Sequence, residues 1–477
     1  MAVLQSDPAL PKPEAPTEAP MLHRVPKRSP FGALLTRTLP EYSGKYQVGV
    51  MDVEIPVENP RTFGTFRHRN IGMNDRGGLL LQTVLLSLFY PADVTGPPKE
   101  PVVWFPQIRQ TVDGFLKMAN RTPNVWYRAV AWPAAAAAIW GTTFPAHKDP
   151  PLLVEEGRKW PLVLFSHGVG CSRLMYSAFC GELASQGYIV AALEHRDGTS
   201  PSSLVTSADG TVKRIDWLQW SDLEWPDLPE QPRNDTTLRH EQIKMRVAEL
   251  TEVVHTMQRL SEGGNSPSAK MDVARWKNID ASEPIMTGHS LGGAAAFALA
   301  AAKEVPVKSL VAFDPAVQRL APWTGELPHP LLVVNSEEFA VGQEWQIFAE
   351  QIAGTVKVQR PDVFTIAGAT HPAFSDVFLI IPNFIARMTG MRARADEVVS
   401  HATNATIDFL RDGHGEAIRQ RARKYVRPDA PTVEVKGPAV DEAKEQAERL
   451  ARAKTLNEEL GAVTAIDSLV GSPVLFT

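Results

Sequence analysis

Residues 284–304 form an apolar run, a turn of small residues and an alanine-rich stretch, and few folds accommodate that succession. The turn contains the pattern G-x-S-x-G at 288–292, written GHSLG. Glycines at its two ends let a strand and a helix approach closely around the central serine. The pentapeptide alone also occurs by chance in long chains, so the neighbouring segments must decide whether it is more than a glycine-rich turn.

The central part of the chain alternates apolar strands with helices. Apolar runs predict strands at 160–168, 188–195, 284–290, 309–315, 330–338 and 363–368. Helical spacing predicts helices at 175–187, 238–261, 292–304 and 344–354. Strands that are apolar throughout are typical of a parallel sheet with both faces buried. We therefore expect an α/β fold in which helices cover both faces of a mostly parallel central sheet.

Composition divides the chain into a central domain and two extensions. Residues 1–40 are rich in Pro, Ala and Glu, which predicts a disordered tail. A β-rich start at 46–57 and 79–93 opens a domain that we place at 41–425. Inside it, 94–155 is expected to be an insertion of loops and short helices, and 198–235 a long polar loop. The extension 426–477 contains a predicted charged helix at 441–460, interpreted as solvated or partner-bound.

Charge and cysteine content exclude several classes of protein. The net charge is −5 and no basic stripe occurs, so a nucleic-acid partner is not expected. Cys171 and Cys180 are the two cysteines of the chain, too few for a disulfide framework, which favours a reducing compartment.

The N-terminal sequence lacks the features of a targeting segment. It has no basic region followed by an apolar run, and Ala2 stands where N-myristoylation needs glycine. No run of about 18 uncharged apolar residues predicts a membrane-spanning helix. We therefore expect a soluble, cytoplasmic protein that can still touch a membrane surface transiently. Its oligomeric state is not indicated by the sequence.

Ser290 is the candidate nucleophile. It lies at the junction of an apolar strand and a helix, which is the context that a strained nucleophile elbow requires. The helix N-terminus also favours the negative charge that develops when a serine attacks a carbonyl.

A serine nucleophile needs a base, and the base needs an acid that orients it. In folds of this class the order along the chain is serine, acid, histidine. Asp314 ends the strand after the serine and is our preferred acid, with Glu337, one strand later, as the alternative. His371 follows the last apolar strand and is the preferred base, ahead of His329, His401 and His414, which fit the expected position less well.

Two backbone N–H groups should stabilise the oxyanion that forms on the substrate. One is expected from Leu291, directly after the nucleophile, and the other from Val169 in the loop of FSHGVG at 165–170. The HRD at 195–197 resembles a kinase catalytic loop, but the other kinase motifs are missing. No metal-ligand cluster or phosphate-binding loop is present, so we expect no metal and no cofactor.

Six stretches together resemble the platelet-activating factor acetylhydrolase family of monomeric α/β-hydrolases, in its intracellular or fungal-like form. They are FSHGVGCSRLMYSAFCGELASQGYIVAALEHRDGTS (165–200), RHEQIKMRVAEL (239–250), GHSLGG (288–293), LVAFDPAV (310–317), LLVVNSEEF (331–339) and THPAFSDV (370–377). The first block is the most specific. The resemblance covers about residues 40–410 and leaves out both tails.

The resemblance implies an α/β-hydrolase fold with Ser290, Asp314 and His371 as the catalytic triad and Val169 and Leu291 as oxyanion donors. It also implies a serine esterase that cleaves short or oxidised sn-2 acyl esters of glycerophospholipids through an acyl-enzyme. Three features depart from the family. The family often has Phe at the position of Leu291, directly after the nucleophile. In this chain Pro315 follows the acid, and the secretion signal of the secreted members is missing.

Two other functions fit the same sequence. A broader lipase-like or cutinase-like carboxylesterase would share the elbow and the triad. A non-catalytic binding protein of the same fold would usually have lost a triad member, and here all three candidates are present. The Trp-rich segments 101–140 and 216–225 fit either an interfacial surface or the core.

Overall fold

The computed structural model describes residues 31–69, 77–96, 100–121, 123–206, 210–358 and 361–412, and a short strand at 463–465. Within these residues one sheet contains eleven strands. Its main path runs in the order β10 (Leu223–Glu224), β1 (Val48–His68), β2 (Gly77–Pro91), β7 (Ile189–Glu194), β6 (Trp160–Ser166), β11 (Ile279–His289), β12 (Leu310–Phe313), β13 (Leu331–Ser336), β14 (Asp362–Ile366) and β15 (Val463–Ala465). The short β5 (His147–Lys148) pairs with β1.

Along this path, β7, β6, β11, β12, β13, β14 and β15 run parallel to one another, whereas the pairs β10–β1, β1–β2 and β2–β7 are antiparallel. The prediction of a mostly parallel sheet is therefore confirmed. The parallel strands end at one edge of the sheet, which is where ligands usually bind in folds of this kind.

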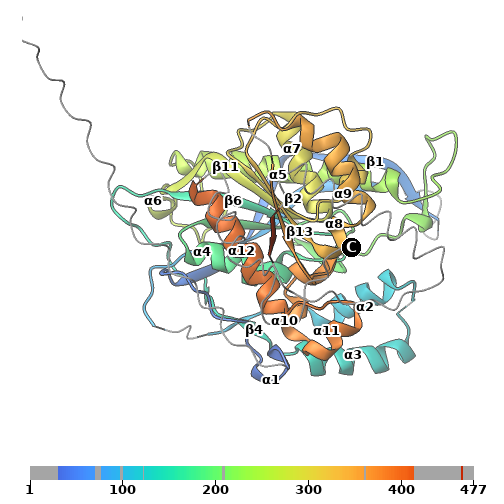
Figure 1. The fold of residues 1–477 in the computed structure, drawn as a ribbon, viewed down its shortest axis with the longest axis horizontal. Helices are drawn as coiled ribbons and strands as arrows, with labels where there is room; N and C mark the ends of the chain where they lie inside the picture. The colour runs from blue at the N-terminus through green and yellow to red at the C-terminus, as the bar shows by residue number, and fades with distance from the viewer. Residues whose placement is uncertain are drawn as a thin grey trace, which may run out of the picture.

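Helices cover both faces of the sheet, as expected (Figure 1). On one face α5 (Thr236–Ser261) and α7 (Leu291–Ala302) pack against Leu162 and Leu164 of β6. On the other, α4 (Ser177–Ser185) and α12 (Ala395–Asp412) pack in the cluster that contains Val163 and Phe165. Successive β6 side chains thus enter opposite hydrophobic layers, which explains why the strand is apolar up to its final serine.

The segment 94–155 contains short elements, in agreement with its irregular sequence. They are β3 (Val102–Val103), α2 (Ile108–Met118), α3 (Val125–Ile139), β4 (Thr143–Phe144) and β5. The segment 198–235 is more ordered than the expected polar loop. It contains the antiparallel hairpin of β8 (Ser202–Thr206) and β9 (Val212–Asp216), a 3₁₀ turn at Trp220–Asp222, and β10.

Around the end of the parallel strands the chain forms several short helices. They are a 3₁₀ turn at Arg173–Tyr176, a 3₁₀ turn at Val317–Leu320, α8 (Glu337–Ala340), α9 (Gln343–Ile347), a 3₁₀ turn at His371–Phe374, α10 (Val377–Ile380) and α11 (Asn383–Met388). The short α6 (Val273–Trp276) instead precedes the start of β11. The single helix expected at 344–354 is instead α9, a π-helical turn at Phe348–Ile352 and a 3₁₀ turn at Ala353–Thr355.

Residues 31–40 pack onto the domain rather than only preceding it. They include α1 (Ala33–Thr36), and Ala33 and Leu39 are buried. Residues 1–30 and the helix expected at 441–460 lie outside the described residues. Among the helices that are described, none combines the length and apolar character needed to span a bilayer.

Candidate active site

Ser290 lies between β11 and α7 in a strained conformation. Its φ is 56° and its ψ −122°, a region that residues other than glycine rarely adopt. The Ser290 N–H donates to the Phe313 carbonyl (2.9 Å), and the Ala316 N–H donates to the Ser290 carbonyl (3.0 Å). These bonds tie the elbow to the end of β12, which holds the strained serine in place.

The flanking glycines are required by packing. A Cβ at Gly288 would lie 2.4 Å from backbone atoms of Gly292, and one at Gly292 would lie 2.0 Å from the Ser166 carbonyl oxygen. The start of α7 therefore touches both β11 and the end of β6. This close approach is the physical reason for the two glycines of the G-x-S-x-G pattern.

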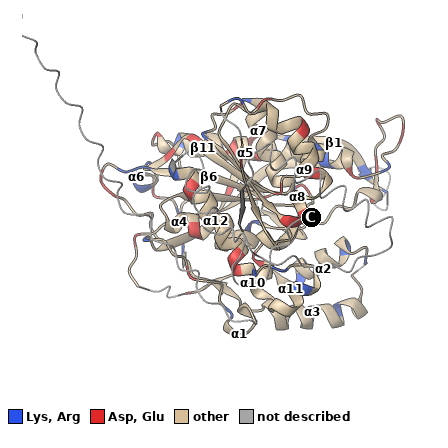
Figure 2. Ribbon diagram, in the orientation of Figure 1, with Lys and Arg blue, Asp and Glu red and all other residues tan. Residues whose placement is uncertain are grey.

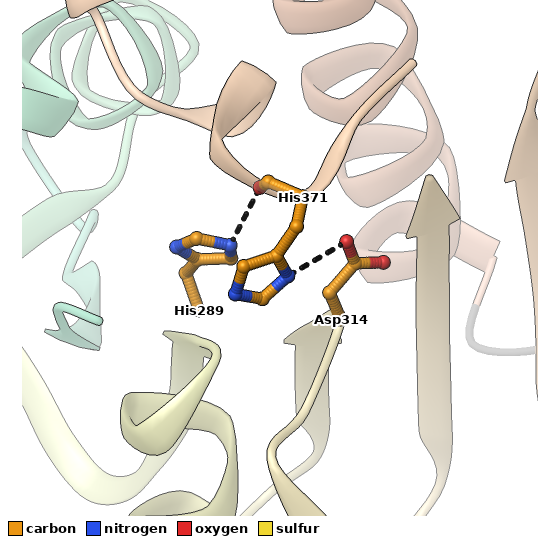
Figure 3. Close-up of side chains that lie close together, drawn as sticks. All are labelled: His289, Asp314 and His371. Carbon is orange, nitrogen blue, oxygen red and sulfur yellow. Dashed lines mark hydrogen bonds and ion pairs between the residues drawn. The ribbon is translucent and has the colours of Figure 1, made fainter. Parts of the chain in front are cut away.

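The structure brings Ser290, His371 and Asp314 into one hydrogen-bonded line. The His371 Nε2 lies 3.1 Å from the Ser290 Oγ. The His371 Nδ1 lies 3.1 Å from the Asp314 Oδ2, and Figure 3 shows this second contact. With the proton on Nδ1, His371 donates to the carboxylate and its Nε2 is left as an acceptor for the serine hydroxyl. That arrangement is the one that a serine nucleophile and its base need.

The surroundings of Asp314 explain why it, and not Glu337, reaches His371. Asp314 is fully buried, and it accepts bonds from the Ser336 N–H (2.7 Å) and the Ser336 hydroxyl (2.6 Å). Glu337 instead accepts from the Gly368 N–H (2.6 Å) and pairs with Arg392. The geometry therefore favours the preferred acid over its alternative.

Opposing influences set the pKa values of this pair. Burial lowers the pKa of His371, but the hydrogen bond and charge of Asp314, with the charges of Glu338 and Glu344, outweigh it and raise the pKa above its ordinary value. Burial raises the pKa of Asp314, and its bonds to His371 and Ser336 oppose that shift. His371 is thus a stronger base than a free imidazole.

His289, which the sequence reasoning did not single out, lies against His371. It is buried, and its Nε2 lies 3.1 Å from the His371 carbonyl oxygen, to which it donates (Figure 3). The Tyr176 hydroxyl lies 2.7 Å from the His289 Nδ1 and is the donor there, since burial keeps the pKa of His289 well below its ordinary value and the ring neutral. His289 therefore fixes the backbone of the base.

Among the residues that the structure describes, one group has the spacing of a possible metal site. It consists of His289, Asp314 and His371, whose ligand atoms lie within 4.8 Å of one another. Each of the four imidazole nitrogens already has a hydrogen-bonding partner in the protein. The spacing is thus explained by the triad and its support.

The two expected oxyanion donors border the same cavity as Ser290 and His371. Leu291 is the first residue of α7, so its N–H has no acceptor within the helix. Val169 lies in the turn after β6, and no acceptor for its N–H occurs among the described residues. A Cβ at Gly168, next to Val169, would lie 3.1 Å from the Ser290 Cβ, so this turn directly adjoins the serine.

The cavity at Ser290 has a volume of about 510 Å³. Several charged side chains line it. Asp235 and Arg239 come from the start of α5, Arg319 from the 3₁₀ turn at Val317–Leu320, and Glu338 and Glu344 from α8 and α9. A second cavity, of about 610 Å³, lies between α2 and α3 and is bordered by none of the triad residues. The first cavity therefore contains the candidate triad, and charged side chains form part of its lining.

Of the remaining candidate histidines, the two that the structure describes, His329 and His401, do not join the site. His329 precedes β13 and His401 lies within α12, where its ring packs against Phe364. His414 lies outside the described residues. Cys171 and Cys180 are free thiols.

Comparison with known proteins places the chain in a family. The family model "Platelet-activating factor acetylhydrolase, isoform II" matches residues 32–423. A platelet-activating factor acetylhydrolase of Gallus gallus is 27% identical over 344 residues, which are 68% of this chain and 76% of that protein. A putative phospholipase A2 of Schizosaccharomyces pombe is 23% identical over 441 residues, 80% of this chain and 94% of that protein.

Among solved structures, a ferulic acid esterase from Streptomyces cinnamoneus matches with a TM-score of 0.49 and 18% identity, over 85% of this chain and 97% of that one. The family match includes every strand of the large sheet except β15, together with the elbow and all three residues of the hydrogen-bonded line. The chain belongs to the platelet-activating factor acetylhydrolase family and is a carboxylic ester hydrolase.

Proposed function

We propose that this chain hydrolyses the sn-2 ester of glycerophospholipids whose sn-2 acyl group is short or oxidised, through a Ser290–His371–Asp314 triad and an acyl-enzyme. The observation that carries the proposal is the line of hydrogen bonds from the Ser290 Oγ through both nitrogens of His371 to Asp314. The names of the relatives support the substrate class.

In the first half of the reaction His371 takes the Ser290 proton on Nε2 as the serine oxygen attacks the ester carbonyl. The carbonyl oxygen becomes an oxyanion, which the N–H groups of Leu291 and Val169 stabilise. Each donor of this kind typically contributes about 3 kcal/mol to the transition state. When the intermediate collapses, the bond to the glycerol oxygen breaks, and His371 returns its proton to that oxygen so that a lysophospholipid leaves.

In the second half a water molecule replaces the alcohol. His371 takes a proton from the water as the water attacks the acyl carbonyl of the acyl-enzyme. Collapse of the second intermediate breaks the bond to Ser290, which recovers its proton from His371, and a carboxylic acid is released. Asp314 holds the imidazole in the required tautomer and stabilises its positive charge in both halves.

The charged lining of the cavity supports a short or polar acyl group. A buried methylene contributes about 0.8 kcal/mol only where it leaves water for an apolar surface. Around Ser290 the lining includes the charged side chains of Asp235, Arg239, Arg319, Glu338 and Glu344. A long saturated chain would gain little there, whereas an acetyl group or an oxidised chain with a polar end loses little.

Hydrolysis of phosphatidylcholines with sn-2 chains from acetyl to palmitoyl tests the substrate class. The purified protein should show kcat/KM values that fall steeply with chain length, and Ser290→Ala should abolish all of them. Oxidatively truncated sn-2 chains with a terminal carboxyl or aldehyde should be cleaved like short ones.

A broader carboxylesterase is the alternative, because it would use the same triad. Activity on simple soluble esters that exceeds activity on every phospholipid, or activity that is flat with chain length, would favour it. Absence of fluorophosphonate labelling of the wild-type protein would instead favour a non-catalytic binding protein.

We also propose that α3 and α11 touch the lipid surface from which the substrate is taken. Trp126 on α3 is 80% exposed and Met388 on α11 is 82% exposed, and Val130 and Phe384 are exposed with them. Both helices are drawn at the lower edge of Figure 1, and α3 is largely free of charged residues in Figure 2. By contrast, Trp104 and Trp225 are buried, so the Trp-rich segments divide between core and surface.

A further inference from the structure

Behind the turn that carries Val169 lies a buried polar network that the reaction described above does not use. Its centre is the ion pair of Arg246, on α5, with Asp197, in the loop after β7, and both side chains are fully buried. Burying such a pair costs desolvation energy, and a well-packed apolar pair often stabilises a fold as well or better. The contacts of this ion pair indicate a more specific role than stabilising the fold.

Arg246 donates to three acceptors at once. Its Nε donates to the Asp197 Oδ2 (2.7 Å), its Nη1 to the His167 carbonyl (2.6 Å) and its Nη2 to the Thr199 hydroxyl (2.7 Å). A planar guanidinium fixes the relative positions of three such acceptors, which a flexible ammonium cannot do. One of the three is the backbone at the start of the turn His167–Gly170.

Thr199 connects the other end of that turn to the same ion pair. Its N–H and its hydroxyl both donate to the Asp197 Oδ1 (3.0 and 2.5 Å), and its carbonyl accepts from the Gly170 N–H (2.8 Å). Arg246 therefore holds the turn at His167, and Thr199 holds it at Gly170. Val169 is enclosed between these two attachments.

The attachments continue into α5 and β6. The Gln242 Nε2 donates to the Asp197 carbonyl (2.8 Å), one helical turn before Arg246. The next turn carries Glu249, which lies 2.5 Å from the His195 Nδ1, and the His195 Nε2 lies 2.7 Å from the Ser166 Oγ at the end of β6. One face of α5 thus reaches the residues on both sides of His167.

A turn that contains Gly168 and Gly170 needs external support to hold a backbone N–H in one direction. An oxyanion donor works only if it lies about 2.7–3.1 Å from the position that the oxyanion occupies. Small displacements therefore reduce the rate of the chemical step much more than they reduce substrate binding.

We propose that Arg246, Asp197 and Thr199 form a positioning unit that fixes the turn His167–Gly170 and thereby aims the Val169 N–H at the oxyanion. The inference rests on the proposed function, since it needs Ser290 as the nucleophile. None of the three residues touches the substrate. They act through the backbone of the turn, so their removal should lower kcat and leave KM nearly unchanged.

Thr199→Val tests the unit, because it removes the hydroxyl that bonds to both Arg246 and Asp197 and keeps the backbone bond to Gly170. With a soluble ester, kcat per active site, counted by fluorophosphonate titration, should fall about tenfold or more. The affinity for a trifluoromethyl ketone, whose tetrahedral adduct places an oxyanion at the same position, should fall by a similar factor. Thr199→Ser keeps the hydroxyl and should restore both values.

Thr251→Val is the matched control. Thr251 is a buried threonine of the same helix α5, and its hydroxyl has no partner among the described residues. This variant should keep the wild-type kcat and ketone affinity. If Thr199→Val does not fold, Gln242→Met removes the bond to the Asp197 carbonyl together with the bond that the Gln242 Oε1 accepts from Arg239 (2.7 Å), and it should lower kcat several-fold.

The outcomes separate the inference from the function on which it rests. Thr199→Val with wild-type kcat and ketone affinity per titrated site, and only a lower thermal unfolding midpoint, would show a purely structural role and overturn the inference. A parallel rise of KM with unchanged kcat would overturn it too. A wild-type protein that cleaves no ester would refute the proposed function, and the inference with it.

Discussion

At the scale of single residues, the backbone of the candidate site is as specialised as its side chains. Ser290 and Asp314 both have positive φ, at 56° and 42°. The serine is rigidly held by bonds to Phe313 and Ala316, and aspartate is among the residues that adopt this region most readily. Two strained positions in contact with one histidine are typical of a functional site.

Asp314→Asn should leave the fold intact and nearly abolish turnover. Asparagine also tolerates positive φ, and its side-chain oxygen can keep a bond to Ser336. Its amide can present a donor to the His371 Nδ1 and so favour the tautomer that cannot accept the serine proton. By analogy with the same change in serine proteases, we expect kcat to fall by about 10⁴-fold. Steady-state kinetics with an unchanged circular dichroism spectrum would support this, whereas near-normal kcat would point to another acid.

Glu338→Gln should shift the pH dependence of kcat/KM. The base must be neutral before it accepts the serine proton, so activity is lost as the pH falls through the raised pKa of His371. Glu338 contributes to that rise and also accepts from the His371 N–H (2.8 Å), a bond that a glutamine oxygen can keep. Removing its charge lowers the pKa of His371.

The acid limb of the profile should therefore move to lower pH in Glu338→Gln. Glu304→Gln, which changes an exposed charge after α7, is the control and should leave the limb in place. A shift of the Glu338→Gln profile to higher pH would contradict the account of the charges around His371.

At the scale of elements, the site depends on how closely α7 approaches the ends of β6 and β11. A Cβ at Gly292 would lie 2.0 Å from the Ser166 carbonyl oxygen and 2.9 Å from that of His167. The same residue therefore sets the distance between the nucleophile elbow and the turn of Val169.

Gly292→Ala should force these elements apart. We expect a loss of unfolding free energy of about 1–3 kcal/mol, measured by denaturant titration, and a larger relative loss of kcat. Gly354→Ala is the matched control, because a Cβ there meets nothing within 4 Å. Equal stability and activity in the two variants would show that the close approach is unimportant.

The elements that could be predicted from the sequence are those whose pattern is local. The strands β6, β7, β12 and β13 are apolar over most of their length because both faces are covered, and such runs stand out in a sequence. The hairpin of β8 and β9 was not predicted, because its buried face includes Ser203 and its outer strand is exposed. Polar strands of this kind resemble loops.

The residues of the candidate site also divide into those that a local sequence pattern reveals and those that only the fold reveals. Ser290, Asp314 and His371 could be found because each follows a recognisable strand, and chain order then assigns their roles. His289 occupies the variable position of G-x-S-x-G, and only the fold shows that it supports the His371 backbone. The pair of Arg246 and Asp197 joins residues 49 positions apart, so no local pattern reveals it.

At the scale of the whole molecule, an ester hydrolase of phospholipids must meet its substrate at a lipid surface. The exposed apolar side chains on α3 and α11 are the candidate contact, and the net charge of −5 gives no general attraction to anionic lipids. We therefore expect binding to phosphatidylcholine vesicles that does not strengthen when anionic lipid is added.

Replacing both Trp126 and Val130 by serine should weaken vesicle binding, measured by sedimentation, by about 30-fold or more, since each exposed apolar side chain that enters lipid contributes on the order of 1–2 kcal/mol. Activity on a soluble ester should remain. The control replaces the exposed Val212 on β9 and the exposed Leu228 after β10 by serine. Equal vesicle binding by both variants would remove α3 from the lipid contact.

The central claim is that Ser290 carries the acyl group during hydrolysis of a short-chain phospholipid. Rapid acid quenching of the protein during turnover of 2-acetyl phosphatidylcholine, followed by peptide mass spectrometry, measures this directly. We expect an acetyl group on the peptide that contains Ser290, formed and lost at rates compatible with kcat, and no adduct in Ser290→Ala. Continued hydrolysis by Ser290→Ala, or an acetyl group on a different residue, would contradict it.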